Sequence, residues 1–187
     1  MATGVFPLNL PNVLTVLRIM LVPALVVALL GNTPGGDVLA AVVFALASLT
    51  DFVDGYLARA RDSITTFGKL MDPLADKLLI VAALISLVSL HRLAGWVATV
   101  IITRELAVTM LRLGATQAGV VMAASMLGKL KTCVQIAAIL AVIAVHEHTQ
   151  PAWVTVLLYL AVAVTVVSGL DYFFGLRRHM QRRAAET

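Results

Sequence analysis

The sequence has little charge, few aromatic residues and a single cysteine. Charged residues make up 13% of its 187 positions and hydrophobic residues 60%, whereas about a quarter of the residues in a soluble domain are charged. This composition argues against a soluble globular domain and against disorder. With only Cys133, the chain has no internal disulfide framework. The mean hydropathy of +0.97 favours a helical protein that crosses the membrane several times.

Apolar segments recur along the chain at lengths that suit membrane helices. A helix needs about 20 mostly apolar residues to cross the hydrocarbon core of a bilayer. We therefore predict an all-α membrane protein with six transmembrane helices, forming a single domain over residues 1–187. The six segments are roughly residues 14–30, 38–60, 69–90, 96–113, 122–145 and 153–174.

The beginning of the chain has two interpretations. Apolar residues between positions 10 and 17 surround Asn9, Asn12 and Thr15, a pattern that suits a short interfacial helix. Alternatively, the first crossing simply begins early. We predict the short N-terminal interfacial helix and leave the second interpretation open.

Basic residues are distributed unevenly over the two ends of the apolar segments. Six crossings place both termini on one side, and Arg92 is the only basic residue in the turns of the other side. Because basic residues favour the cytoplasmic side, we expect cytoplasmic termini in an integral protein of the cell (inner) membrane. The net charge of +4 fits anionic lipid, and we expect no nucleic-acid partner. The bias comes from Arg18, Arg59, Arg61, Lys69, Lys77, Arg112, Lys129, Lys131, Arg177, Arg178, Arg182 and Arg183.

The second segment ends in carboxylates, although ionisable groups inside membrane helices are costly and usually functional. Asp51 and Asp54 are three residues apart, and Gly55 and Ala58 follow at helical spacing. These positions share one helix face, which carries two carboxylates and then two positions with almost no side chain. Arg59, at the end of the helix, can contact a phosphate.

The third segment begins with a similar pattern. Gly68, Asp72 and Asp76 step by four residues, so the two helices of this hairpin can bring four carboxylates together near the cytoplasmic edge. Close carboxylates repel unless a cation lies among them, and oxygen ligands suit Mg²⁺, Mn²⁺ or Ca²⁺. The pattern predicts a divalent-metal site for a phosphorylated substrate. The alternative for each carboxylate alone is a solvated helix-end charge or an ion pair.

The residues from Asp51 to Asp76 resemble the signature of the CDP-alcohol phosphatidyltransferases. That signature reads D-x2-D-G-x2-A-R-x8-G-x3-D-x3-D, and all eight of its defined positions are present. The six expected crossings also resemble the six-helix fold of the family, so the resemblance covers most of the chain. It further implies a homodimer.

Other features resemble the phosphatidylglycerophosphate synthase subfamily. These are the opening Asn9–Thr15 with Arg18, Thr50 before the first aspartate, the Arg104-Glu105 pair and residues 128–132. The resemblance implies a phosphatidyltransferase. A hydroxyl of sn-glycerol 3-phosphate attacks the lipid-linked phosphorus of CDP-diacylglycerol, CMP leaves, and phosphatidylglycerol phosphate forms.

The resemblance also implies a role for each residue of the signature. Asp51, Asp54 and Asp72 are expected to bind Mg²⁺ or Mn²⁺. Asp76 is expected to be the general base that takes the hydroxyl proton, and also to touch a metal ion. The expected contacts with CDP come from Thr50, Asp51, Asp54, Gly55, Ala58, Arg59 and Gly68.

A phosphorylated acceptor requires cations outside the signature. The candidates are Arg104 and Arg112, eight residues apart on the fourth segment, and Lys129 and Lys131 at the start of the fifth. For the lysines, the alternative is lipid contact, and for Arg104 it is an intrahelical ion pair. We expect Arg104 and Glu105 to diverge, because helix neighbours point about 100 degrees apart, so that each needs a partner elsewhere.

Two other functions are weighed. The first keeps the chemistry but uses another acceptor, such as phosphatidylglycerol in a cardiolipin synthase, or inositol phosphate. The second is a small cation transporter, which requires carboxylates spread through the depth of the bilayer. We expect no acidic group in the outer half of any helix, which argues against a transporter.

Overall fold

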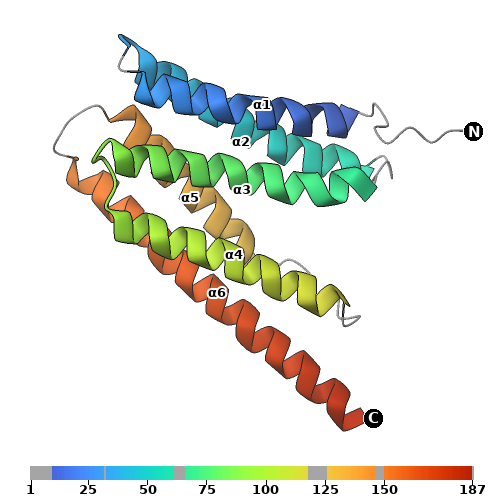
Figure 1. The fold of residues 1–187 in the computed structure, drawn as a ribbon. Helices are drawn as coiled ribbons and strands as arrows, with labels where there is room; N and C mark the ends of the chain where they lie inside the picture. Colours follow the sequence, from blue (N-terminus) through green and yellow to red (C-terminus); the bar gives the residue numbers. More distant parts are fainter. Residues whose placement is uncertain (1–9, 32, 61–65, 118–125, 146–149, 187) are drawn as a thin grey trace, which may run out of the picture. The chain divides into compact units, whose positions relative to one another are not determined.

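The structure is a computed structural model that describes the backbone of residues 10–31, 33–60, 66–117, 126–145 and 150–186. Side chains are described for residues 13–31, 33–50, 74–117, 126–145, 150–178 and 181. Within these ranges the chain is all-helical, as predicted (Figure 1). The helices are α1 (Leu10–Leu30), α2 (Gly36–Ala60), α3 (Thr66–Ser89), α4 (Gly95–Gln117), α5 (Met126–Ala144) and α6 (Ala152–Glu186).

The predicted segments and the helices agree within a few residues at most ends, but two differences stand out. Residues from Leu10 onward belong to one continuous helix, α1, so the first helix begins early and contains the stretch assigned to an interfacial helix. Residues 1–9 lie outside the described part. Helix α6 continues to Glu186 instead of ending near 174, because the polar tail contains four Arg together with Leu, Met, Gln, Ala and Glu, all of which favour helix.

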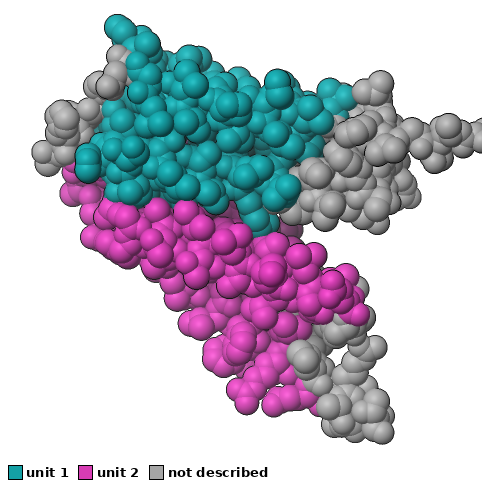
Figure 2. Space-filling view, in the orientation of Figure 1, with its two compact units in different colours: residues 1–93, 142–148 teal, residues 94–141, 149–187 magenta. Residues whose placement is uncertain are grey.

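The chain divides into two compact units (Figure 2). Unit 1 comprises residues 1–93 and 142–148, and unit 2 comprises residues 94–141 and 149–187. In unit 1, helix α1 packs against α2 and α3, and α2 also contacts α3. Its interior combines bulky residues such as Phe44 and Leu84 with alanines such as Ala47 and Ala83, all four of them fully buried. Alanines allow helix backbones to approach closely.

In unit 2, helix α4 packs against α6. Val97 and Ile101 of α4 are buried, as are Val154 and Ala161 of α6. Trp96, in the first turn of α4, and Tyr159, about two turns into α6, stack with their ring centroids 6.0 Å apart. This aromatic pair is an additional contact between the two helices.

Among the described residues, three helices are long and apolar enough to cross a membrane. The candidate spans are Val13–Leu30, Met126–Ala144 and Ala152–Arg178 in the part of the chain that the structure describes. In α2 the apolar stretch Gly36–Thr50 ends directly before Asp51. Helices α3 and α4 carry charged residues within their length. The chain is therefore an integral membrane protein, and charged residues interrupt some of its apolar helices.

Candidate active site

The signature carboxylates lie in two helices of unit 1 that contact each other. The backbone is helical through Asp51 and Asp54 in α2 and through Asp72 and Asp76 in α3. The three- and four-residue spacings on which the prediction depends are therefore present as helical spacings. The side chains of residues 51–73 are outside the described set, so the convergence of the carboxylates stays a prediction, as do the CDP contacts from residue 51 to Gly68.

Asp76 is the one signature carboxylate whose side chain is described. It is half-buried and lies between Ala75, fully buried, and Leu79, 1% exposed. This part of α3 thus faces the interior of unit 1 on one side and leaves Asp76 partly accessible. Among the side chains that the structure describes, no three His, Cys, Asp or Glu groups are close enough to hold a metal ion. The side chains of the three other signature aspartates lie outside this set, and their hard oxygen donors suit a divalent cation.

Arg18 of α1 was assigned to the cytoplasmic charge bias, but the structure places its side chain inside unit 1. It is 1% exposed, and its Nε donates a hydrogen bond to the carbonyl oxygen of Ala47 in α2, at 3.3 Å. Ala47 is one helical turn before Asp51, and in an α-helix its carbonyl accepts the Asp51 N–H. Sequence reasoning missed this contact, although an arginine within an apolar helix was the available signal.

Thr50, expected to contact CDP, uses its hydroxyl within its own helix. Its Oγ1 donates a hydrogen bond of 2.8 Å to the carbonyl oxygen of Ala47. The same carbonyl therefore accepts bonds from Thr50 and Arg18. With its proton committed in this way, the Thr50 hydroxyl retains lone pairs that can accept a hydrogen bond from a ligand.

The sequence led us to expect no acidic group in the outer half of any helix. That expectation is wrong, because an acidic residue stands at the end of α2 opposite to Asp51. Asp37 lies in the first turn of α2, far along the helix from Asp51. Arg92 donates from Nη1 to Asp37 Oδ1 at 2.7 Å and from Nη2 to Oδ2 at 3.0 Å. Asp37 is therefore half of a two-bond ion pair that joins the first turn of α2 to the turn that follows α3. A carboxylate in the first turn also suits the positive end of the helix dipole.

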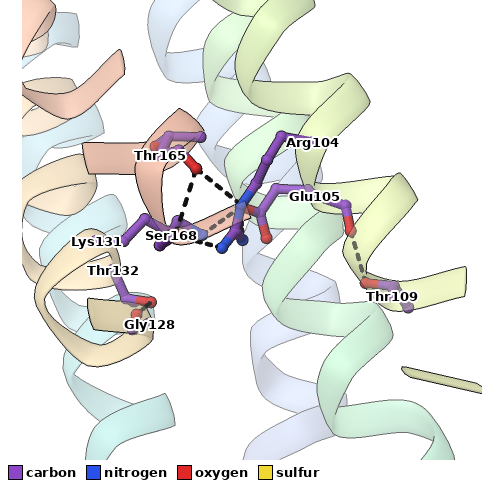
Figure 3. A network of polar contacts seen from close by, with 8 residues as sticks. All are labelled: Arg104, Glu105, Thr109, Gly128, Lys131, Thr132, Thr165 and Ser168. Carbon is purple, nitrogen blue, oxygen red and sulfur yellow. Dashed lines mark hydrogen bonds and ion pairs between the residues drawn. The ribbon is translucent and has the colours of Figure 1, made fainter. Parts of the chain in front are cut away.

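The cations predicted for the acceptor phosphate all lie in unit 2, and two of them belong to a polar network (Figure 3). Arg104 of α4 points toward α6. Its Nε donates to the carbonyl oxygen of Thr165 at 3.1 Å, and its Nη2 donates to Ser168 Oγ. Thr165 and Ser168 are 0% and 2% exposed. The guanidinium is therefore held in the interior of unit 2.

Glu105 completes this network and contradicts the expectation that it diverges from Arg104. Its Oε1 accepts a bond from Arg104 Nη1 at 3.2 Å and another from Lys131 Nζ of α5. Neighbouring Cβ atoms do point in different directions on a helix, but both side chains are long enough to bend toward one point. Lys131 is buried, with 6% of its surface exposed. Arg104 and Lys131 thus share one carboxylate oxygen of Glu105 as their hydrogen-bond acceptor.

The two other predicted cations are placed differently. Arg112 is exposed, and its guanidinium carbon lies 5.7 Å from the ring centroid of Tyr172 on α6. Contact with an aromatic face stabilises a cation while leaving its N–H groups available. Lys129 is exposed at the start of α5. The network therefore contains Arg104 and Lys131, whereas Arg112 and Lys129 present their charge at the surface of unit 2.

Comparison with known proteins identifies the class first. Residues 8–167 match the model of the CDP-alcohol phosphatidyltransferase family. The chain belongs to this family, whose members use a divalent metal ion. The expected resemblance is thereby confirmed.

Individual relatives narrow the comparison. The chain is 44% identical to the CDP-diacylglycerol–glycerol-3-phosphate 3-phosphatidyltransferase of Bacillus subtilis strain 168, over 88% of this chain and 93% of that protein. It is 45% identical to the "Probable phosphatidylglycerophosphate synthase" of Mycobacterium tuberculosis strain H37Rv, over 88% and 79%. The Rickettsia felis CDP-diacylglycerol–glycerol-3-phosphate 3-phosphatidyltransferase is 35% identical, over 91% and 97%.

Proposed function

We propose that this chain transfers the phosphatidyl group of CDP-diacylglycerol to sn-glycerol 3-phosphate, giving phosphatidylglycerol phosphate and CMP. The observation that carries the proposal is the 44% identity, over nearly the whole chain, to a protein named for this reaction. The complete family signature on α2 and α3 supports it. The protein is then a transferase of phospholipid biosynthesis that acts on one lipid and one small acceptor.

The residues proposed to act on the donor, CDP-diacylglycerol, belong to unit 1. Asp51, Asp54, Asp72 and Asp76 would hold Mg²⁺ or Mn²⁺, because four carboxylates on two adjoining helices form a hard oxygen donor set. A divalent ion bound there neutralises the pyrophosphate of the donor. Gly55, Ala58 and Gly68 leave room for the nucleotide, Thr50 accepts a hydrogen bond from it, and Arg59 contacts its phosphate.

Asp76 is the proposed general base. Its carboxylate takes the proton of the acceptor hydroxyl as the hydroxyl oxygen bonds to the lipid-linked phosphorus. The bond between that phosphorus and the CMP oxygen breaks, and CMP leaves with the electron pair. The half-buried setting of Asp76, with Ala75 and Leu79 fixed in the interior of unit 1, supports this role because it restricts the carboxylate to few orientations.

Unit 2 supplies the cations that the acceptor phosphate requires. Arg104, Arg112, Lys129 and Lys131 are proposed to bind this phosphate, as a phosphate monoester needs several charge-assisted hydrogen bonds. The unit has eight basic and only three acidic residues. This excess supports a phosphorylated acceptor over a neutral alcohol such as serine.

The proposed assembly in the membrane follows from the charge pattern and the family. Six crossings with both termini in the cytoplasm would place α2, α3 and their signature at the cytoplasmic face of the inner membrane. The apolar helices α1, α5 and α6 support an integral location. A homodimer is proposed from the family resemblance.

The test is CMP release by purified protein from CDP-diacylglycerol, with and without Mg²⁺ or Mn²⁺. The acceptors are glycerol 3-phosphate, phosphatidylglycerol, inositol phosphate and serine. Metal-dependent release with glycerol 3-phosphate alone is expected. Release with another acceptor would keep the signature site and overturn the acceptor. Folded protein without release for any acceptor would overturn the enzyme and favour transport of a cation.

A further inference from the structure

We propose that Glu105 is a positioning residue, which holds Arg104 and Lys131 together as one cradle for the acceptor phosphate. This inference rests on the proposed function, because it assumes a phosphorylated acceptor. It adds a residue that is itself acidic and therefore does not bind the phosphate. Glu105 acts through the two cations that it holds.

The first argument is that both cations meet on a single atom. Arg104 Nη1 and Lys131 Nζ both donate to Oε1 of Glu105, although the three residues come from α4 and α5 (Figure 3). Two positive groups brought this close repel each other in a site that is largely shielded from water. The carboxylate between them offsets the repulsion, so their proximity depends on Glu105.

The second argument is that α6 fixes the orientation of Arg104. The guanidinium donates to the Thr165 carbonyl and to Ser168, and Ser168 Oγ in turn donates to the same carbonyl at 3.3 Å. Gly169 provides the space, since a Cβ at this position would lie 3.2 Å from Arg104 Cγ and 3.4 Å from its Nε. Helix α6 is thus shaped around the arginine side chain.

The third argument is that the network retains capacity for an anion. A guanidinium has five N–H donors, and the contacts with Thr165, Ser168 and Glu105 use three of them. The remaining N–H donors of Arg104 can bind an anion such as a phosphate.

The experiment uses the purified full-length protein and compares Glu105→Gln with wild type. Gln keeps the shape of the side chain but loses the charge that stabilises its bonds to both cations. We expect the KM for glycerol 3-phosphate to rise about tenfold, whereas kcat and the KM for CDP-diacylglycerol change less than about threefold. Asp171→Asn is the matched control, because Asp171 is an exposed acid of the same unit, and should leave all three constants unchanged.

A second readout does not depend on turnover. Glycerol 3-phosphate should raise the melting temperature of the wild type and of Asp171→Asn, and this rise should be smaller for Glu105→Gln. Gly169→Ala tests the same cradle from α6, because a Cβ 3.2 Å from Arg104 Cγ requires the arginine to shift by a few tenths of an ångström. This variant should also raise the acceptor KM. If Glu105→Gln does not fold, Gly169→Ala decides the matter.

Three results would overturn the inference. An acceptor KM that is unchanged or lower in Glu105→Gln would show that the carboxylate only dilutes the positive charge. Equal changes in the KM values for both substrates of Glu105→Gln, together with a lower melting temperature, would show a purely structural role. An unchanged KM for glycerol 3-phosphate in Gly169→Ala would show the same. Absence of CMP release by the wild type with glycerol 3-phosphate is a different result, because it overturns the proposed function itself.

Discussion

The two units differ in the sign of their net charge and in the contacts that their buried cations make. Unit 1 contains seven acidic and six basic residues, a balance of −1, whereas unit 2 contains three acidic and eight basic residues, a balance of +5. The signature aspartates belong to unit 1, and all four cations proposed for the acceptor phosphate belong to unit 2. Under the proposed function, donor chemistry would therefore depend on residues of unit 1 and acceptor recognition on residues of unit 2.

Buried cations are also accommodated differently in the two units. In unit 1, the Nε of Arg18 donates to a backbone carbonyl that Thr50 also uses. In unit 2, Arg104 and Lys131 share the carboxylate of Glu105. Variants in unit 1 should therefore affect catalysis or stability, and variants in unit 2 should affect acceptor affinity.

The largest expected effect is that of Asp76→Asn in unit 1. Loss of the general base should lower kcat by about 10²–10⁴-fold, while CDP-diacylglycerol still binds because the other three aspartates remain. Single-turnover CMP release and a separate nucleotide-binding assay measure the two quantities. Near-normal turnover would remove Asp76 from the proposed role.

Arg18→Ala should have the next largest effect, on stability. The change removes a side chain that is 1% exposed between α1 and α2, and the cavity should cost about 2–4 kcal/mol. Thermal unfolding in detergent measures the loss. Arg112→Ala, at an exposed site in unit 2, is the matched comparison and should shift the melting temperature far less. Equal shifts would contradict the buried placement of Arg18.

Arg112→Gln tests whether an exposed cation of unit 2 contributes to the affinity for glycerol 3-phosphate. It removes an exposed charge over Tyr172, so the KM for glycerol 3-phosphate should rise about threefold to tenfold, as expected for one lost charge-assisted bond. The KM for CDP-diacylglycerol should stay constant. Steady-state kinetics in which each substrate is varied in turn measures both. Arg178→Gln, in the polar part of α6, serves as the control for loss of charge alone.

The smallest effect on activity is expected at the ion pair of Asp37 and Arg92. The side chains are 13% and 20% exposed, so loss of one partner should cost more than the ~1 kcal/mol of a solvent-exposed pair. Asp37→Asn should therefore lower the melting temperature but leave both KM values unchanged. A double-mutant cycle with Arg92→Gln isolates the pair. A change in catalysis would show that this end of α2 is coupled to the signature.

The helices were predictable because their signals are local. Apolar runs bounded by turns, such as Gly31–Gly36, identified the segments, and the helical spacing of Asp72 and Asp76 was visible in the sequence. The exact end of α6 was not, since residues after 174 are polar but still good helix formers. The early start of α1 was not predictable either. Composition alone does not distinguish a separate interfacial helix from the first turns of a membrane-crossing helix.

The sequence by itself determined the class of protein, the helical segments, the family signature and the cations outside it. Only the tertiary structure decided which charges meet. Arg18 reaches a carbonyl 29 residues away, Glu105 holds a lysine 26 residues away, and Arg104 bonds to α6 across 61 residues. Long side chains can bend to many partners, so their contacts depend on which helices pack together and not on spacing along one helix.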